Sequence, residues 1–541
     1  MKKSYKYLSL IVVLVMGMSA VTINNDRLYE IGKNIEIFVN VYKELNTHYV
    51  DDVDPSQLMR TGIDAMVGSL DPYTNYISES QIQNYRIATE GRYDGIGAKS
   101  AEIDGKITII EPFEGSPADK AGIKAGDIIT AINGKSTEGK TREDLNAIVR
   151  GVPGTSLDIT IDRPGKGIMK KSIERGSISM KNVPYAGMVS DEVGYISLTT
   201  FTSNASSNIA KELKKLKKND NLKGVIIDLR SNGGGLLAEA INISNIFVPQ
   251  GEEIVSTKCK VKERDQFFKT TKSPLDLDIP LAVMINSTSA SASEIVSGVI
   301  QDLDRGVIIG QRSFGKGLVQ NHKEVGFNNR LKVTTSKYYI PSGRCIQGVE
   351  YEDGKPVDIP DDQRSTYYTK NRRPVLDGGG VTPDVALELT KVPNIIKGLR
   401  SKHMIFKYVT EWSNKRDSIE AVSQFKFVDY NDFLSYLDKN NFDYQTESEK
   451  LIDNLVKESD KEGFEFQEEV DVLLTKIERE KENDLTLHKA EIINLIENDI
   501  ATRFYYQAGK TEQKLASDDE IKKAIEILTD QKKYNSILKK G

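Results

Sequence analysis

The chain has 541 residues, and at roughly 150 residues per domain this length predicts three or four structural units. Hydrophobic residues make up 38% and charged residues 28%, a mixture typical of folded proteins and unlike that of disordered ones. With 74 Lys and Arg against 79 Asp and Glu, the formal net charge is -5, which argues against a dedicated nucleic-acid-binding protein. Two cysteines are too few for a disulfide scaffold, and the sequence leaves open whether Cys259 and Cys345 pair.

The chain begins with a basic and then apolar segment. Lys2, Lys3 and Lys6 precede an uncharged run over residues 7–23. This order is typical of a secretory signal, and the run is also just long enough for an uncleaved membrane anchor. Residues 1–23 are therefore predicted to be a signal peptide or an anchor of an exported protein, with a buried helix as the remaining alternative.

Two regions of different character follow. Apolar residues at helical spacings, such as Ile35, Phe38 and Tyr42, predict a helical region over residues 24–90. Over residues 91–170, short β-branched runs alternate with Gly and Pro turns and with two helical pieces, which predicts a small β-rich domain.

The rest of the chain has an α/β pattern followed by a helical one. The apolar runs 225–229 and 281–285 are predicted to be strands buried on both faces, each followed by a helix. They belong to a predicted core over residues 171–392. Residues 393–541 are rich in Lys, Glu, Asp and Leu and predict helices with solvated faces of mixed charge. The fold class predicted from these patterns is multidomain α/β.

The run Ser-Thr-Ser-Ala-Ser-Ala-Ser-Glu over residues 287–294 directly follows an apolar strand. A serine at a strand-to-helix turn can act as a nucleophile beside helix N–H groups that stabilise an oxyanion. Ser291 and Glu294 also have the spacing of a capping box, which is a structural alternative. The pattern alone does not choose among Ser289, Ser291 and Ser293.

Three glycines follow another strand, in the run Asp-Leu-Arg-Ser-Asn-Gly-Gly-Gly over residues 228–235. Such glycines let the backbone approach a substrate closely with its N–H groups exposed. A phosphate-binding loop is disfavoured because no Gly-Lys-Ser or Gly-Lys-Thr closes the run. A plain sharp turn remains the alternative.

Lys316 lies in the run Ser-Phe-Gly-Lys-Gly-Leu-Val-Gln over residues 313–320. In a strand, Lys316, Leu318 and Gln320 would share one face, so Gln320 could orient the lysine. A lysine acts as general base only when burial lowers its pKa from about 10.4 to about 7–8, and the apolar neighbours favour such burial. An ordinary surface lysine is the alternative.

The β-rich domain has its own candidate site in Gly95-Ile96-Gly97-Ala98. A loop of exposed N–H groups there could bind the terminal carboxylate of a peptide, while a neighbouring strand edge pairs with the peptide backbone. A single Gly-x-Gly is weak on its own. Its combination with the later turns at residues 122–127 and 132–134 is much more specific.

Taken in order, these motifs resemble the C-terminal processing peptidases, also called tail-specific proteases. The resemblance extends from about residue 42 to residue 385 and also includes Leu-Asp-Pro at 70–72, Tyr-Ile-Pro-Ser-Gly-Arg at 339–344 and Gly-Val-Thr-Pro-Asp at 380–384. It implies a PDZ-like domain over residues 91–170 and a serine peptidase core over residues 171–392.

The resemblance also implies roles for single residues. Ser291 would be the nucleophile, Lys316 the general base, and Gln320 would support the lysine. The oxyanion would be held by the N–H of Ala292 and by that of Gly233 or Gly234. No metal or cofactor is expected, and the small number of histidines fits a serine–lysine dyad.

The implied partners are protein or peptide substrates with exposed C-terminal tails, bound by Gly95, Ile96, Gly97 and Ala98. Ile96 is expected near the end group. An activating adaptor and self-association through the C-terminal helices are further options. The implied location is the periplasm, with tethering to the inner membrane if the apolar segment stays attached. The alternatives are a non-catalytic PDZ scaffold on a degenerate core and an acyl-transfer enzyme for small thioesters.

Overall fold

A computed structural model describes residues 25–82, 87, 89–352, 355–358, 360–388 and 391–539. The chain divides into two compact units, Met1–Tyr76 with Tyr351–Lys355, and Ile77–Glu350 with Pro356–Gly541. The predicted signal or anchor over residues 1–23 lies outside the described residues. Among the helices that the structure describes, none is both long and apolar enough to cross a bilayer.

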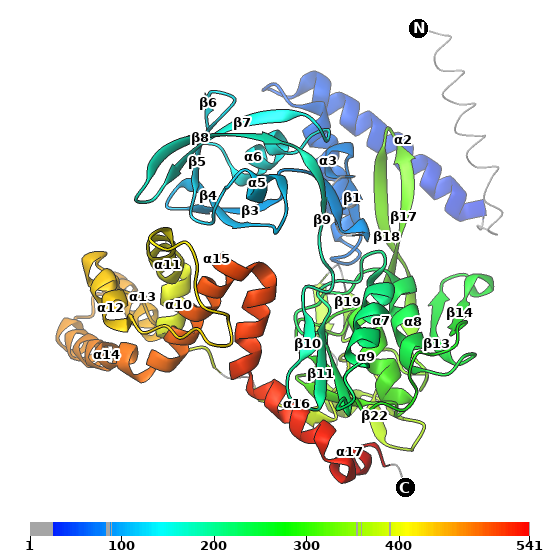
Figure 1. The fold of residues 1–541 in the computed structure, drawn as a ribbon. Helices are drawn as coiled ribbons and strands as arrows, with labels where there is room; N and C mark the ends of the chain where they lie inside the picture. The colour runs from blue at the N-terminus through cyan, green and yellow to red at the C-terminus, as the bar shows by residue number, and fades with distance from the viewer. Residues whose placement is uncertain are drawn as a thin grey trace. The chain divides into compact units, whose positions relative to one another are not determined.

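The first unit contains two helices joined by a short loop (Figure 1). Asp54 begins the second helix, because its carboxylate accepts hydrogen bonds from the N–H groups of Ser56 and Gln57. Pro55 occupies the first turn, where a missing N–H leaves no helical bond unmade. The elements are α2 (Asn25–His48), α3 (Pro55–Gly68) and the short strand β1 (Asn75–Ile77).

The β-rich domain predicted over residues 91–170 contains strands β2 to β7 and the start of β8, and β9 beyond that range pairs with β2. Its elements are β2 (Arg92–Gly95), β3 (Ala98–Ile103), β4 (Lys106–Pro112), α5 (Pro117–Lys120), β5 (Ile128–Ile132), β6 (Lys135–Ser136), α6 (Arg142–Val149), β7 (Ser156–Arg163), β8 (Gly167–Glu174) and β9 (Gly176–Ser179). The main sheet has the order β3-β4-β5-β7-β8. Leu157, Ile159 and Ile161 alternate along β7 and point into the core. Strand β3 lies at the sheet edge, with α6 packed against it.

The predicted α/β core is a sheet with the order β10-β11-β12-β15-β16-β23, parallel except for the β10–β11 pair. Every residue of β12, β15 and β16 is buried, as their continuous apolar runs predict. Helices α7, α8 and α9 contribute to the apolar core on one face of this sheet. The bounds are β10 (Ala186–Met188), β11 (Val193–Ser197), α7 (Ala205–Leu216), β12 (Gly224–Asp228), α8 (Leu237–Phe247), β15 (Leu281–Ile285), α9 (Ala292–Asp302), β16 (Val307–Gly310) and β23 (Val385–Ala386).

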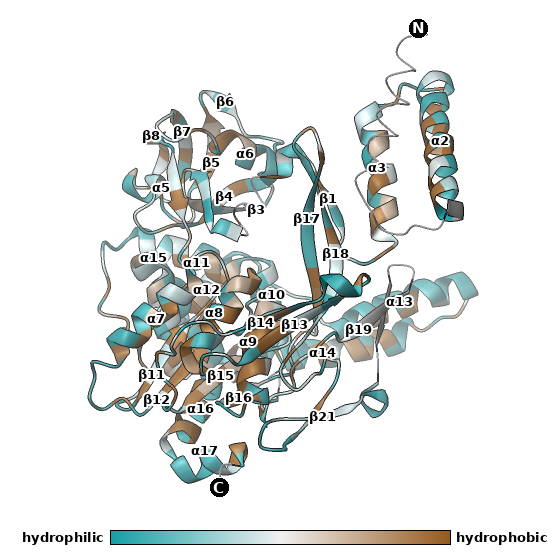
Figure 2. Cartoon of the chain, turned by 90° about the vertical axis from the view of Figure 1, so that its right-hand side faces the viewer, coloured by the Kyte–Doolittle hydropathy of each residue, from teal (hydrophilic) through white to brown (hydrophobic). Residues whose placement is uncertain are grey.

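The other face of the core sheet is covered by the last two helices of the chain, α16 (Asp519–Thr529) and α17 (Gln531–Leu538). Figures 1 and 2 show α16 running alongside the core strands. Ile521, Ile527 and Leu528 on α16 are at most 2% exposed and pack on strands β11, β12, β15 and β16. The sequence predicts solvated helices here, but one face of each packs on the core sheet.

A second, antiparallel sheet pairs β14 with β13, β13 with β18 and β18 with β17. Cys259 lies in β13 and Cys345 follows β18, and both are free thiols, so no disulfide joins them. The bounds are β13 (Glu253–Cys259), β14 (Gln266–Lys269), β17 (Leu318–Gly326) and β18 (Asn329–Tyr339), followed by the short strands β19 (Val349–Glu352), β20 (Lys355–Asp358), β21 (Thr366–Tyr368) and β22 (Pro374–Leu376).

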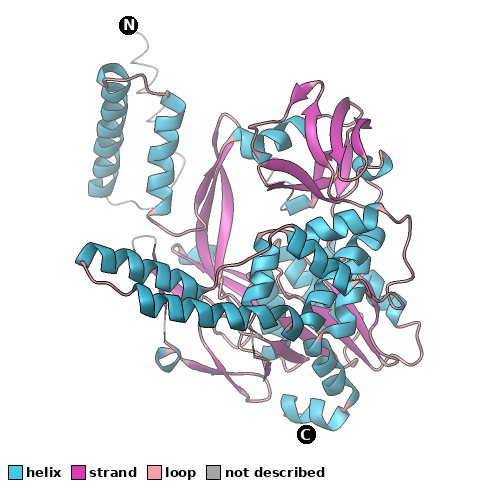
Figure 3. Ribbon diagram, turned by 90° about the vertical axis from the view of Figure 1, so that its left-hand side faces the viewer, coloured by secondary structure: helices cyan, strands magenta, loops and turns pink. Residues whose placement is uncertain are grey.

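The remaining C-terminal helices have an apolar core of their own, rich in aromatic residues. Tyr408 packs edge-on against Phe433, with ring centroids 5.0 Å apart, and Trp412 packs against Phe425 and Phe427. Figure 3 shows these helices in cyan, and α13 and α14 among them lie side by side. The bounds are α10 (Asn394–Ser401), α11 (Met404–Asn414), α12 (Tyr430–Lys439), α13 (Glu447–Glu462), α14 (Gln467–Leu487) and α15 (Lys489–Ser517).

Candidate active site

Ser291 lies at the turn between β15 and α9, at the carboxyl edge of the parallel sheet. Its φ of 57° and ψ of -113° are unusual for a residue with a side chain, and such strain is typical of a nucleophile held on a sharp turn. Ser291 is half-buried, whereas Ser289 and Ser293 are fully buried. Their hydroxyls donate to the carbonyls of Leu229 and Asn232, each at 2.8 Å. The structure therefore favours Ser291, a choice that the residue pattern left open.

Glu294 lies in the first turn of α9 and is fully buried. Its Oε2 accepts the N–H of Ser291 at 2.7 Å and that of Lys316 at 2.8 Å. Its Oε1 accepts the Ser313 hydroxyl and the Gly315 N–H, each at 2.6 Å. Burial raises the pKa of this carboxyl, and the four donors oppose the rise. Ser291 is the N-cap of α9, but Glu294 does more than cap, because it joins the backbones of the serine and the lysine.

Tyr338 makes a second connection between the same two residues. Its ring is buried at the end of β18, and its hydroxyl lies 2.5 Å from the carbonyl oxygen of Lys316 and 3.1 Å from that of Ser291. Sequence reasoning missed Tyr338, because its position depends on strand pairing between distant parts of the chain. The one available signal in the sequence is that Tyr338 directly precedes the run Tyr-Ile-Pro-Ser-Gly-Arg at 339–344, which is part of the resemblance described above.

The glycine loop after β12 packs directly against Ser291. Gly234 has a φ of +95°, and a Cβ there would lie 2.9 Å from the Ser291 Cβ, so a larger residue would not fit. The Gly234 N–H donates to the side-chain oxygen of Asn232 at 2.9 Å. In the described part of the chain, no acceptor is bonded to the Gly233 N–H, so Gly233 is the better placed of the two predicted donors. Ala292 is the first residue of α9, where the helix itself leaves the N–H unpaired.

Lys316 lies in the loop before β17, which begins at Leu318. The predicted strand face shared by Lys316, Leu318 and Gln320 is therefore wrong. The backbone N–H of Lys316 donates to the Glu294 carboxylate and does not take part in a strand ladder. The Lys316 side chain is half-buried beside the buried Leu318, but Phe314, which was expected to desolvate it, is 55% exposed.

Gln320 lies in β17 opposite Thr334 of β18. Its side-chain N–H donates to the Thr334 hydroxyl at 3.3 Å, next to a register shift in the ladder. Support of the lysine by Gln320 therefore stays a prediction.

Three parts of the chain match known protein families. Residues 192–354 match peptidase family S41, residues 109–163 a PDZ domain, and residues 395–528 the C-terminal helical domain of probable PDZ-proteases. A carboxy-terminal-processing protease of Bartonella bacilliformis is 37% identical over 341 residues, which cover 62% of this chain and 77% of the relative. The carboxy-terminal processing protease CtpA of Bacillus subtilis (strain 168) is 30% identical over 424 residues, which cover 77% of this chain and 89% of the relative. The chain belongs to the carboxy-terminal processing proteases.

Membership in this family makes the chain a serine-type peptidase with a PDZ domain. The predicted family, fold class and enzyme class are therefore confirmed. Among solved structures, a photosystem II D1 C-terminal processing protease covers 69% of this chain and 97% of its own, at 24% identity and a TM-score of 0.36. The family assignment rests on the sequence relatives.

The predicted peptide-binding loop of this protease, Gly95 to Ala98, connects β2 and β3. Gly97 has a φ of +78°, and a Cβ there would lie 2.4 Å from the Ser116 Cβ. Ile96 is 4% exposed and belongs to the apolar core of the domain, and its expected place near a peptide's end group stays a prediction. Any contact of Ile96 with a bound tail is therefore through its backbone.

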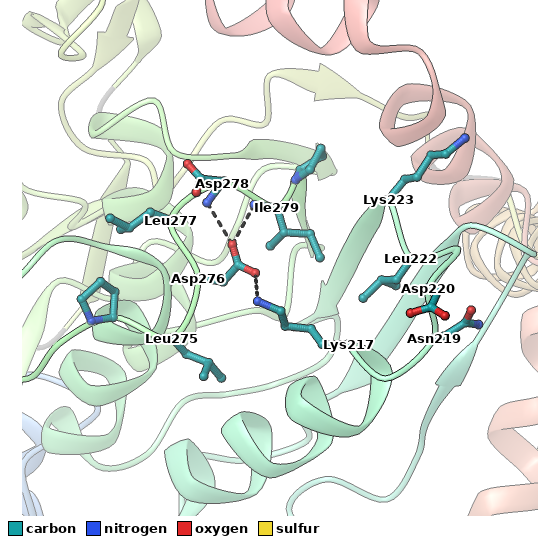
Figure 4. Close-up of a pocket in the computed structure, with 12 residues that line it drawn as sticks. Lys217, Asn219, Asp220, Leu222, Lys223, Leu275, Asp276, Leu277, Asp278 and Ile279 are labelled. Carbon is teal, nitrogen blue, oxygen red and sulfur yellow. Dashed lines mark hydrogen bonds and ion pairs between the residues drawn. The ribbon is translucent and has the colours of Figure 1, made fainter.

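A hollow of about 730 Å³ lies at the opposite edge of the core sheet, before the amino ends of β12 and β15 (Figure 4). Residues of the loops 219–223 and 274–280 line it, and Lys217 bonds to Asp276 at 2.5 Å. None of the predicted catalytic or peptide-binding residues lines this hollow. Ligand sites in parallel sheets lie at the carboxyl ends of the strands, where Ser291 is found.

Proposed function

We propose that this protease is an endopeptidase of the cell envelope that binds C-terminal tails through its PDZ domain and cuts peptide bonds with a Ser291–Lys316 dyad. The observation that carries the dyad is the double connection described above. Glu294 and Tyr338 are both buried, and each bonds to the backbones of Ser291 and Lys316. Two independent buried groups that fix one spacing are expected where two side chains must react together.

In the first step, the neutral amine of Lys316 takes the proton of the Ser291 hydroxyl as the oxygen attacks the peptide carbonyl. A tetrahedral oxyanion and a lysine ammonium form. The ammonium then gives its proton to the leaving amine, the C–N bond breaks, and an acyl-serine ester remains. Water attacks the ester with the same lysine as base, which releases the new carboxyl end and restores Ser291.

The oxyanion is held by the N–H groups of Ala292 and Gly233. The first belongs to the amino end of α9, whose dipole also favours negative charge. The second belongs to the loop that packs on Ser291. Loss of one such donor typically lowers the rate by about 10²–10³.

The PDZ domain is proposed to bind the substrate tail along strand β3. That strand lies at the edge of its sheet beside α6, which leaves a strand edge for backbone pairing with a peptide. The N–H groups of the Gly95–Ala98 loop take the terminal carboxylate. A fluorescent peptide with an apolar, free C-terminus should bind the full chain, whereas the same peptide with an amidated C-terminus should bind at least about tenfold more weakly. Equal binding of the two peptides would contradict carboxylate capture.

The dyad is tested with casein, an unfolded protein, as the substrate of the chain from residue 25 onward. We expect cleavage by the wild type and none by Ser291→Ala or Lys316→Ala. The matched controls are Ser287→Ala and Lys323→Ala, which change exposed residues of the same two segments. Because the lysine must lose its proton, activity should rise between about pH 6 and 9. Cleavage by Ser291→Ala would overturn the dyad, and an inert wild type that still binds tail peptides would favour the scaffold alternative.

The envelope location is proposed from the basic and apolar start of the chain. Fractionation of cells that express the full chain should place it outside the cytoplasm. Sequencing of its amino terminus then distinguishes a cleaved signal from an anchor.

A further inference from the structure

The C-terminal helix α16 reaches the two loops that flank the proposed nucleophile. Arg230 follows β12 at the start of the glycine loop, and its side chain is 18% exposed. Its guanidinium bonds to Asp228 at 2.7 Å, and to Asp518 at 2.8 Å and Glu520 at 2.6 Å at the start of α16. Burial alone would lower the pKa of Arg230, but pairing with Asp228 and Asp518 raises it, so the charge is held firmly.

Glu520 also contacts the loop that carries Lys316. While one carboxylate oxygen accepts from Arg230, the other accepts from the side-chain N–H of Gln311 at 2.6 Å. Gln311 directly follows β16 and lies two residues before Ser313, whose hydroxyl bonds to Glu294. One carboxylate therefore bridges the loop after β12 and the loop after β16. The strand between them, β15, leads to Ser291.

The position of Glu520 is fixed by how α16 is built. The Asp518 carboxylate caps the helix by accepting the N–H groups of Glu520 and Ile521 at 3.0 and 3.2 Å. The apolar face of α16 is buried on the core strands, which sets the rotation of the helix. An ion pair between flexible surface side chains would lack both the fixed helix start and the fixed helix rotation.

We propose that Glu520, assisted by Asp518, is a positioning residue of the peptidase site, which sets the spacing between the oxyanion loop and the lysine loop through Arg230 and Gln311. The inference rests on the proposed Ser291–Lys316 dyad. It makes the end of the C-terminal helical region a built-in part of the catalytic unit.

The test compares Glu520→Gln with Glu526→Gln in the chain from residue 25 onward. Glu526 lies on the same helix and is also ion-paired, with Lys523 at 2.8 Å, but its side chain is 53% exposed. For Glu520→Gln we expect kcat on fluorescein-labelled casein to fall about 10- to 100-fold, since an amide has only one accepting oxygen and cannot serve both Arg230 and Gln311, while KM stays within about twofold. Labelling of Ser291 by a fluorophosphonate should slow by a similar factor, and thermal unfolding should stay close to that of Glu526→Gln.

Gln311→Ala cuts the same bridge from the other side and serves if Glu520→Gln does not fold. In a double-mutant cycle, Gln311→Ala and Glu520→Gln should be non-additive in kcat, because both break one connection. Wild-type kcat in either folded variant would overturn the inference, as would an equal loss in Glu526→Gln. Ser291→Ala separates the two proposals. If it is inert, these variants judge Glu520 alone, and if it cuts casein, the dyad and this inference both fall.

Discussion

The loops at the proposed peptidase site and the β3 edge of the PDZ domain are built on opposite principles. At the peptidase site, buried polar side chains such as Glu294, Tyr338 and Asn232 bond across loops that follow different strands. In the PDZ domain, β3 lies at a sheet edge, and the helix α6 that packs against it begins at an exposed cap, Thr141. Bond cleavage needs one spacing of reacting atoms, whereas tail binding needs an open edge that accepts many sequences. Substitutions should therefore separate kcat effects in the core from binding effects in the PDZ domain.

Outside the proposed dyad itself, the largest effect is expected from Glu294→Gln. A carboxylate can accept all four of its present donors, but an amide offers one oxygen and places an NH₂ group against the others. We expect kcat for casein to fall about 100-fold or more, the factor typical when reacting groups move by about 1 Å. The measurement is kcat for casein of Glu294→Gln, with Ser287→Ala as the control. A loss of kcat below about threefold would contradict the role given to Glu294.

The difference in stability between the wild type and Glu294→Gln should depend on pH. Because burial raises the Glu294 pKa in the folded protein, folding favours the protonated form. That contribution is complete below the ordinary glutamate pKa of about 4.3 and is lost as the pH rises through the folded-state pKa. Glutamine is neutral throughout. The unfolding temperature of the wild type minus that of Glu294→Gln should therefore fall as the pH rises. If this difference rises instead, burial does not disfavour the charged carboxylate of Glu294.

Two neighbouring glycines provide the next test. At Gly234 a Cβ would lie 2.7 Å from the Ala290 carbonyl oxygen, and the φ of +95° is strained for any side chain. Gly234→Ala should therefore destabilise the loop by about 1–3 kcal/mol and lower kcat about tenfold or more. At Gly233 no described atom beyond the adjacent residues lies within 4 Å of the Cβ position, and alanine keeps the N–H, so Gly233→Ala should stay within about twofold of wild type. Parallel kinetics and thermal melts measure both, and equal losses would contradict the loop geometry.

The sequence predicts those parts of the fold and the site that depend on local patterns. Continuous apolar runs indicate β12 and β15, and the serine-rich run places a strand-to-helix turn at Ser291. It also suggests a strand at Lys316, which is wrong for a physical reason. The backbone of Gly315 packs against that of Gly348, and a Cβ at Gly315 would lie 2.9 Å from the Gly348 Cα. The Gly315 N–H donates to the Glu294 carboxylate and not to a neighbouring strand.

Contacts between distant segments have no such local signal. Tyr338 reaches Lys316 because β18 pairs with β17, and Glu520 reaches Arg230 from 290 residues away. An amphipathic pattern predicts that α16 buries one face, but it does not say against which partner. The inward orientation of Ile96 is likewise set by the packed domain and not by its neighbours in the sequence.

A smaller effect is expected for Tyr338→Phe. The ring stays in place, but the hydroxyl that bonds to the Lys316 and Ser291 carbonyls is lost. Leaving a buried carbonyl unpaired should lower the free energy of unfolding by about 1 kcal/mol and kcat about tenfold. Tyr339→Phe, one residue along the same strand, is the control and should change neither. If Tyr338→Phe and Tyr339→Phe behave alike, the Tyr338 hydroxyl does not position the proposed dyad.

The smallest effect should come from Thr141→Ala at the start of α6, and it should appear in binding only. The Thr141 hydroxyl accepts the Asp144 N–H at 3.1 Å, and the Asp144 carboxylate accepts the Thr141 N–H at 3.0 Å. Removing the hydroxyl should destabilise α6 by about 1 kcal/mol and so loosen the packing of α6 against β3. Affinity for a free-carboxylate tail peptide should then fall about two- to fivefold by fluorescence anisotropy, while kcat for casein is unchanged. Ser172→Ala, an exposed change on strand β8 at the far edge of the sheet, is the control. A kcat loss in Thr141→Ala equal to its affinity loss would mean that the β3 edge and the proposed dyad are coupled, and the separation between an open binding edge and a fixed catalytic core would not hold.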